Sequence, residues 1–389
     1  MKEVGLGIYL HIPFCRKACH YCDFHFSTQL HNQDLMISAL IRELEMRLGK
    51  EQPEIGSIYF GGGTPSVLNE HQLNLLMENI FRLGRVSQSA EITFEANPED
   101  IQPAALHIWK KAGINRLSIG LQSSHDDRLR WMNRSHLAEV GFSSVKYAQD
   151  EGFNNISTDL MFGYPDQSAD ELQNDLEAFL SLRTPHLSAY HFTLEPETVF
   201  GRWQQKGRLK PLPEEESSQL FLQVFDCLES NGLEAYEISN FAQPGFEAVH
   251  NRNYWRQKPF TGIGPSAHGF DGKKLRYANT ASNHVYVQQI SAGRLSEEPE
   301  EMTAAALANE FILTRLRTRE GLPPDLFHSS FGADLWKEKN REIQKAMAES
   351  MLMVENNALI LTRKGRLFAD YLAQELFFSE EDTTLQTNW

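Results

Sequence analysis

Cysteine is scarce in this chain, which contains four cysteines among 389 residues. Long hydrophobic runs are also missing, and none approaches the roughly 18 residues of a membrane-spanning helix. The first residues, MKEVGLGIYLHIPF, lack the charged start and the long apolar stretch of a signal peptide. We therefore expect a cytoplasmic protein without a transmembrane helix. In that reducing compartment, clustered cysteines are expected to be metal ligands or catalysts rather than disulfides.

Basic residues are fewer than acidic ones, with 37 Lys and Arg against 52 Asp and Glu, which gives a formal net charge of -15. Such a protein repels a phosphate backbone, so nucleic acid is not an expected partner. The length suits one large α/β domain and at least one smaller unit.

A short strand rich in β-branched and aromatic residues, a loop and an amphipathic helix recur six times in the first half of the chain. Strands that alternate with helices form parallel βα units with right-handed connections. The sequence therefore predicts an α/β fold, a partial (β/α)6 barrel of the TIM type. The clearest helices are expected at 34–48 and 169–182. The six strands are expected at 7–12, 57–60, 91–97, 116–122, 156–163 and 186–193.

Three units are expected along the chain: a barrel core at 1–195, a barrel extension at 196–300 and a C-terminal domain at 301–389. The extension begins with a linker-like stretch at 195–212, followed by a helix at 214–231 and a strand around AYEISNFA at 235–242. The order of the C-terminal elements predicts a winged-helix-like domain with a packing or docking role. These elements are expected as helices at 302–317, 333–349 and 363–376 and a hairpin at 353–362.

Polar side chains and glycines collect where the predicted strands end. In α/β barrels, the carboxyl edge of the strands carries the chemistry. We therefore expect a functional site built from the residues at these strand ends, which are Cys15, Gly61, Gly62, Gly63, Glu95, Gln122 and Asp159.

Three of the four cysteines, Cys15, Cys19 and Cys22, follow the first strand with C-x3-C-x2-C spacing. Two metal sites agree with this spacing. In one, a nearby histidine (His11, His20 or His25) completes a structural Cys3His zinc site. In the other, the three thiolates hold a [4Fe-4S] cluster, and the fourth iron stays open for a bound molecule. The position at the edge of a large barrel favours the cluster.

The cysteine motif with GGGTPS at 61–66 resembles the signature of the radical S-adenosylmethionine (radical SAM) superfamily. The resemblance implies that SAM chelates the open iron, close to Gly61, Gly62, Gly63 and Thr64. Further positions resemble the branch that contains HemN oxidases and HemW haem chaperones. In that branch the matching residues contact SAM, and here they are Tyr9, Glu95, Gln122, Arg134 and Asp159. Each also has an alternative interpretation as a solvated or capping residue.

Two features distinguish the two groups of this branch. HemN-type oxidases carry a fourth cysteine where this chain has Phe24, and an extension before the motif that this chain lacks. By contrast, HNRNYW at 250–255 resembles the H-N-x-x-Y signature of HemW proteins. This likeness implies haem binding near His250 and Tyr254, since imidazole and Tyr are known iron donors. Trp255 and Phe260 are candidate contacts to the macrocycle, and His268 is a further candidate. Cys227 is expected to pack in a core.

The resemblance thus predicts a haem chaperone that binds a [4Fe-4S] cluster, SAM and haem. It implies acceptor haem proteins, expected to be respiratory, as partners, and it leaves open a homodimer and peripheral contact with a membrane. Two alternatives remain. One is an oxygen-independent coproporphyrinogen III oxidase, and the other is a zinc-stabilised binding module.

Overall fold

The computed structural model describes residues 5–49, 51–295, 299–381 and 384–386. Within these residues, one sheet of twelve strands has the order β12-β11-β10-β9-β1-β2-β3-β4-β5-β6-β8-β7. Its centre is parallel and follows chain order, which confirms the predicted partial (β/α)6 barrel. These central strands are β1 (Leu6–Ile12), β2 (Glu54–Gly62), β3 (Arg85–Ala96), β4 (Arg116–Gln122), β5 (Ile156–Phe162) and β6 (His186–His191).

Further strands extend both ends of this parallel centre. On the far side of β1, β9 (Phe260–Ile263) pairs parallel to it, a pairing that the local sequence pattern does not reveal. The antiparallel strands β10 (His268–Phe270), β11 (Leu275–Ala278) and β12 (Glu300–Glu301) continue from there. Next to β6 lie β8 (Asn240–Ala242) and β7 (Glu234–Ala235).

The single strand expected at 235–242 is wrong, because this segment turns back on itself to form β7 and β8. The carboxylate of Glu237 accepts the amide of Ser239 at 2.9 Å, and the amide of Tyr236 donates to the carbonyl of Asn240 at 3.1 Å. These two bonds close the turn.

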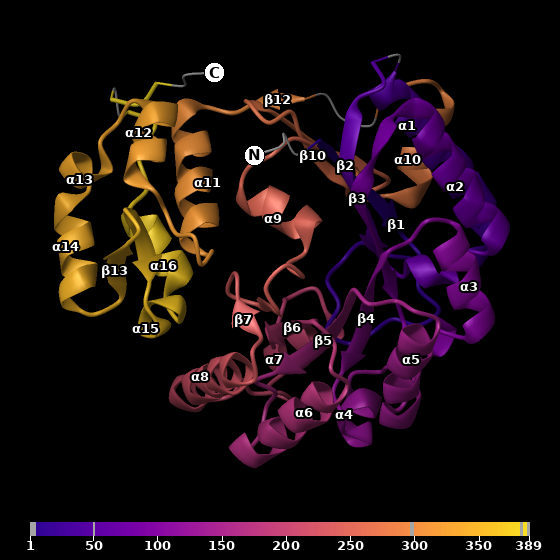
Figure 1. The fold of residues 1–389 in the computed structure, drawn as a ribbon, viewed down its shortest axis with the longest axis horizontal. Helices are drawn as coiled ribbons and strands as arrows, with labels where there is room; N and C mark the ends of the chain where they lie inside the picture. Colours follow the sequence, from indigo (N-terminus) through magenta and orange to yellow (C-terminus); the bar gives the residue numbers. More distant parts are fainter. Residues whose placement is uncertain (1–4, 50, 296–298, 382–383, 387–389) are drawn as a thin grey trace.

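Helices cover the outer face of the sheet, as Figure 1 shows for α1, α2, α3 and α5. Apolar strand residues such as Ile8, Leu10, Ile58 and Phe60 are fully buried in this outer core. The helices are α1 (Gln33–Leu48), α2 (Glu70–Leu83), α3 (Pro103–Lys111), α4 (Asp126–Trp131), α5 (Ala138–Asp150), α6 (Ala169–Ser181), α7 (Val199–Gln205), α8 (Glu214–Ser230), α9 (Val249–Trp255) and α10 (Asn283–Ser291).

The expected linker at 195–212 is also wrong in part, because it contains α7. Thr198 caps the start of α7 by accepting the amide of Gly201, and Phe200 is completely buried. The burial of this aromatic residue gives the helix a tertiary anchor.

The C-terminal domain lies beside the barrel, with α9 between the two (Figure 1). It has its own core, which includes Phe311, Phe327 and Phe331. Its elements are α11 (Ala304–Leu316), α12 (Pro324–Phe331), α13 (Leu335–Glu338), α14 (Asn340–Ala348), β13 (Leu352–Glu355), β14 (Ala358–Leu361), α15 (Arg363–Arg366) and α16 (Ala369–Glu375). The unit boundaries at 195 and 300 stay predictions.

Two helices expected in the C-terminal domain are each interrupted. The expected helix at 333–349 breaks at Lys339, where φ is -120°, and the one at 363–376 breaks at Phe368, where φ is -121°. The short helix α12 was not predicted.

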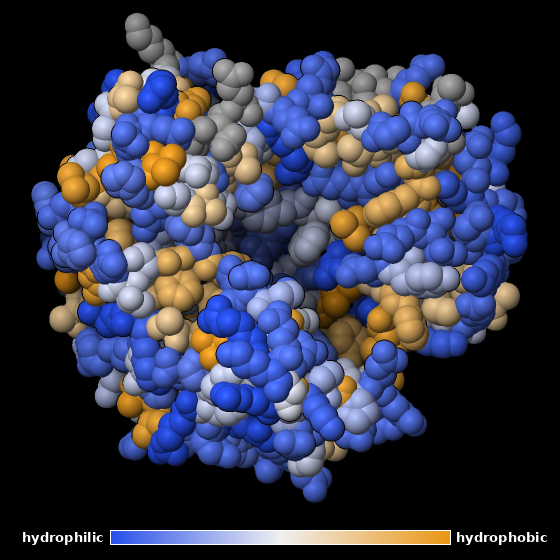
Figure 2. Space-filling model, turned by 180° about the vertical axis from the view of Figure 1, so that it is seen from behind, coloured by the Kyte–Doolittle hydropathy of each residue, from blue (hydrophilic) through white to orange (hydrophobic). Residues whose placement is uncertain are grey.

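The face opposite to that of Figure 1 is largely hydrophilic and is hollowed near its centre (Figure 2). Among the described residues, no helix combines the length and the apolar character needed to cross a membrane.

Candidate functional site

The three clustered cysteines lie on a loop that leaves β1 at the carboxyl edge of the sheet. The loop closes on itself, because the amide of Cys15 donates to the carbonyl of Ser27 at 3.0 Å. All three cysteines are partly exposed. Their side chains are therefore accessible from the edge at which barrel proteins bind ligands.

The far end of the cysteine loop is held by α4 and α7. The amide of His20 donates to the carbonyl of Met132 at 3.0 Å, and the amide of Phe200 donates to the carbonyl of His20 at 3.1 Å. Phe200 stacks on Trp131, with ring centroids 4.1 Å apart. The loop is thus positioned by parts of the chain more than one hundred residues away.

A chain of hydrogen bonds connects two of the cysteine sulfurs through the barrel edge. The hydroxyl of Thr64 donates to Sγ of Cys15 at 3.2 Å, and Asn97 donates to that hydroxyl at 3.4 Å. Arg134 donates to Asn97 at 2.8 Å and to Sγ of Cys19 at 3.4 Å. Donors aimed at sulfur stabilise thiolates and cluster sulfides. The donor set therefore fits an iron–sulfur cluster held by these cysteines.

Burial has the opposite effect on the free thiols, because it disfavours their charged thiolate form. It raises the pKa of Cys15 to about 11 and that of Cys22 to about 12. Thiols with such pKa values need a bound cation to become ligating thiolates at neutral pH. In the part of the chain that the structure describes, no group of three or more His, Cys, Asp or Glu side chains is arranged to hold a metal ion. The cysteines therefore stay predicted ligands.

The glycines at the end of β2 and directly after it are required by close contacts within the protein. Gly62 has φ +101°, and a Cβ there would lie 2.5 Å from Nδ1 of His11. A Cβ on Gly63 would lie 2.7 Å from the carbonyl oxygen of Phe14, and one on Gly61 would lie 2.9 Å from the ring of Tyr59. This glycine segment therefore packs directly against β1 and the start of the cysteine loop.

Two predicted carboxylates lie on the inner face of the sheet and interact with each other. Glu95 accepts the hydroxyl of Tyr59 at 2.6 Å, and Asp159 accepts that of Ser118 at 3.3 Å. Burial raises the pKa of Glu95 to about 7, and the nearby Asp159 adds to this rise. Burial raises the pKa of Asp159 to about 6. A bound group with hydroxyls or positive charge would complete the environment of both carboxylates.

Gln122, Arg134 and Tyr9 are not solvated surface residues. Gln122 ends β4 with φ +74°, a backbone conformation that glycine normally adopts. Arg134 lies in the loop before α5, and its Nε atom is buried without a hydrogen-bond partner among the described residues. Tyr9 is stacked on Tyr59, with centroids 6.0 Å apart. The structure thus brings Gln122 and Arg134 to the carboxyl edge, where Arg134 contacts Cys19 of the cysteine loop. Tyr9 lies on the inner face, with its ring centroid 6.5 Å from that of His250.

His250 and Tyr254 lie deeper, on the inner face near the amino ends of the strands. Nδ1 of His250 lies 2.9 Å from Oγ of Ser57, and its Nε2 lies 2.8 Å from the hydroxyl of Tyr254. Only 1% of His250 is exposed. Burial lowers the pKa of His250 to about 3, so the ring is neutral. Both ring nitrogens are engaged, and this pair is not on the protein surface.

A buried polar network next to His250 was not predicted from the sequence. The carboxylate of Glu91 accepts the amides of Val249 and His250, both at 3.1 Å, and lies 3.9 Å from the guanidinium of Arg116. A second pair resembles the first, because His186 lies 2.8 Å from the hydroxyl of Tyr236. The only sequence signal for this network was a polar residue at every second strand position. A strand with one face exposed to solvent has the same pattern, so the signal does not identify a buried network.

The remaining candidates are spread around α9 and its surroundings. Trp255 is half-buried, Phe260 packs edge-on against Tyr254 with centroids 4.5 Å apart, and His268 is exposed. Cys227 packs against the outer core, as expected. Phe24 is 67% exposed, which makes it accessible beside the cysteine loop.

A partial α/β barrel with a three-cysteine loop after its first strand defines the radical SAM class of proteins. Residues 9–179 match the family model of the Radical SAM superfamily, and residues 302–368 match that of the HemN C-terminal domain.

Relatives similar over nearly the full length narrow this class. Heme chaperone HemW of Bacillus subtilis is 36% identical over 93% of this chain and 96% of its own length. Heme chaperone HemW of Escherichia coli is 34% identical over 98% of this chain and all of its own length. The chain therefore belongs to the HemW family.

The solved structure of coproporphyrinogen III oxidase (HemN) from Escherichia coli has the same fold. It superimposes with a TM-score of 0.83 over 96% of this chain and 90% of that protein, at 23% sequence identity.

Proposed function

We propose that this chain is a haem chaperone that carries a [4Fe-4S] cluster and SAM, binds haem and delivers it to acceptor haem proteins. The observation that carries the proposal is its similarity, over nearly the full length, to proteins named heme chaperone HemW. The proposal includes a cytoplasmic location and respiratory haem proteins as acceptors. It leaves a homodimer and peripheral membrane contact open.

We assign the cluster to Cys15, Cys19 and Cys22. When bound, the cluster offers one open iron to the amino and carboxylate groups of SAM. Thr64 and Arg134 hold two of the sulfurs by hydrogen bonds. We assign the surrounding SAM contacts to Tyr9, Gly61, Gly62, Gly63, Thr64, Glu95, Gln122, Arg134 and Asp159.

The cluster assignment is tested by iron, sulfide and zinc analysis after anaerobic purification. We expect about four irons and four sulfides per chain and a brown protein. Zinc without iron would replace the assignment by a structural zinc site.

We assign haem binding to the segment around His250 and Tyr254. Because His250 and Tyr254 are hydrogen-bonded to each other, either side chain must leave this bond to reach iron. We expect His250→Ala and Tyr254→Phe to weaken haem binding by about tenfold or more, measured by absorbance titration of the purified protein.

The matched control for this titration is His186→Ala, which breaks the similar buried pair of His186 and Tyr236. We expect this variant to keep its haem affinity. Transfer to an apo-haem protein, with and without the cluster, is the second measurement. Unchanged affinity in both variants of the His250 pair would remove this segment from the haem site.

The alternative function is coproporphyrinogen III oxidase activity, which the fold similarity to HemN favours. Anaerobic incubation with coproporphyrinogen III, SAM and a reductant separates the two functions. We expect no turnover. Accumulation of protoporphyrinogen IX would contradict the chaperone proposal and support the oxidase function.

A further inference from the structure

A continuous column of packed side chains joins the proposed haem residues to the proposed SAM residues. Ser57, Tyr59 and Gly61 succeed one another on the inner face of β2, because alternate residues of a strand share a face. The ring of Tyr59 packs on that of His250, with centroids 5.2 Å apart. Its hydroxyl donates to Glu95 at 2.6 Å. Tyr59 therefore contacts a residue of each proposed site.

The ring of Tyr59 is confined on the sides that face away from His250. A Cβ on Gly61 would lie 2.9 Å from Cε1 of Tyr59, so no space separates this ring from the glycine segment. Tyr9 lies beside it, with centroids 6.0 Å apart and an angle of 27° between the two ring planes. Tyr59 therefore cannot shift without loosening its bond to Glu95.

The ring of His250 is enclosed as well. A Cβ on Gly7 would lie 3.3 Å from Cε1 of His250, which leaves little space on the side of β1. The two ring nitrogens lie 2.9 Å from Oγ of Ser57 and 2.8 Å from the hydroxyl of Tyr254. A His250 ring that leaves these partners to bind iron must therefore change its contact with Tyr59.

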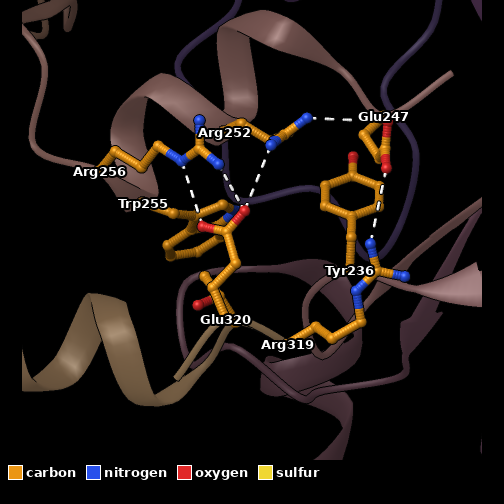
Figure 3. A pocket seen from close by; sticks show the side chains of 8 residues that line it. Tyr236, Glu247, Arg252, Trp255, Arg256, Arg319 and Glu320 are labelled. Carbon is orange, nitrogen blue, oxygen red and sulfur yellow. Dashed lines mark hydrogen bonds and ion pairs between the residues drawn. The ribbon is translucent and has the colours of Figure 1, made fainter. Parts of the chain in front are cut away.

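The backbone of α9 is held from two sides, so the side chain of His250 moves rather than the helix. The carboxylate of Glu91 accepts the first two amides of α9, both at 3.1 Å. On the opposite side of the helix, Glu320 accepts hydrogen bonds from Arg252 and Arg256, each at 3.2 Å, as Figure 3 shows. Movement of His250 is thus directed into the column and not into a displacement of α9.

The bond from Tyr59 determines how well Glu95 can bind a ligand. Burial raises the pKa of Glu95 to about 7, and the hydrogen bond from Tyr59 opposes this rise. Without this bond, Glu95 is protonated more often and loses a fixed orientation. A protonated carboxyl group is a weaker acceptor for the hydroxyls of a nucleoside and does not attract positive charge.

We propose that Tyr59 couples the two ligand sites, so that haem at His250 lowers the affinity for SAM at Glu95. By linkage, SAM lowers the affinity for haem by the same factor. The inference rests on the proposed function and adds to it a regulation of one ligand by the other. It implies that the chain holds SAM most firmly when it carries no haem.

SAM titration by calorimetry tests this coupling, with anaerobically purified full-length protein that contains its cluster, in the presence and absence of haem. We expect the SAM affinity of wild type to be about fivefold lower when haem is bound. Tyr59→Phe keeps the ring but has no hydroxyl for Glu95, so its two SAM affinities should be equal. A purely structural role of Tyr59 changes both affinities together and leaves their ratio at the wild-type value.

The matched control is Tyr286→Phe, because the hydroxyl of Tyr286 in α10 also donates to a glutamate, Glu43, at 2.6 Å. This variant loses the same kind of bond outside the column and should keep the fivefold ratio. Equal SAM affinities in a wild type that binds both ligands would overturn the coupling alone, as would an unchanged ratio in Tyr59→Phe or a lost ratio in the control. A wild type that binds no haem or no SAM would overturn the proposed function and this inference together.

Discussion

The glycine at position 62 combines an unusual backbone angle with a contact that allows no side chain. Its φ of +101° disfavours any other residue, and a Cβ would overlap the ring of His11. His11 in turn lies 2.7 Å, through Nε2, from the carbonyl of His25 in the cysteine loop. A side chain at position 62 therefore displaces the residue that supports this loop.

We expect Gly62→Ala to destabilise the protein by more than the roughly 1–2 kcal/mol of backbone strain alone, and to lower its iron content. The matched control is Gly207→Ala, because Gly207 has φ +68° but no atom within 4 Å of its Cβ position. Urea unfolding and iron analysis of both variants give the comparison. Equal losses in the two variants would contradict the role of His11.

Glu95 gives the stability of the apoprotein a defined pH dependence. Burial raises its pKa from 4.5 to about 7. Between these values the folded protein keeps a proton that the unfolded chain releases, so the free energy of unfolding falls as pH rises, by about 1.4 kcal/mol per pH unit. This decrease ends above pH 7, where both states are ionised.

We expect Glu95→Gln to remove this contribution, because Gln keeps a hydrogen-bond acceptor for Tyr59 but does not titrate. The measurement is urea unfolding between pH 5 and pH 8, with the exposed Glu78→Gln as control. A wild type and a Glu95→Gln variant with parallel pH profiles would contradict the raised pKa.

At the scale of single elements, α7 supports the cysteine loop from outside the barrel. Phe200 stacks on Trp131 and lies 5.5 Å from the ring of His20. We expect Phe200→Ala to cost about 3–5 kcal/mol of stability and to increase the alkylation rate of the clustered cysteines. The control is Phe225→Ala, which removes a buried ring of α8 far from this loop in sequence. Faster alkylation in both variants would indicate general loosening instead.

The central strands were predictable because each has a strong local pattern. The buried outer residues of β1 and β2 alternate with polar or small ones, and glycines mark the end of β2. The pairing of β9 with β1 joins segments about 250 residues apart, and no local pattern encodes it. The turn at Glu237 and the breaks at Lys339 and Phe368 depend on single side-chain or backbone contacts, which strand and helix periodicity do not report.

At the scale of the whole molecule, the predicted site residues lie at two depths of the barrel. The cysteines and glycines lie at the carboxyl edge of the strands, whereas His250 and Tyr254 lie near their amino ends. The cysteines and glycines were recognisable because their spacing is specific. Asn97, Glu91 and Arg116 were not, since a polar residue on the inner face of a barrel has the same spacing as one exposed to water. Tertiary structure alone distinguishes these two cases.

The buried pair of Glu91 and Arg116 limits which substitutions these two positions can accept during evolution. Either charge left alone in the barrel interior costs several kcal/mol, whereas loss of both together is far less harmful. We therefore expect related chains to keep both residues of this pair or to replace both together, which an alignment of such chains would test. Because Glu91 also accepts the first two amides of α9, such a double change would release the start of the helix that carries His250 and Tyr254, the proposed haem residues.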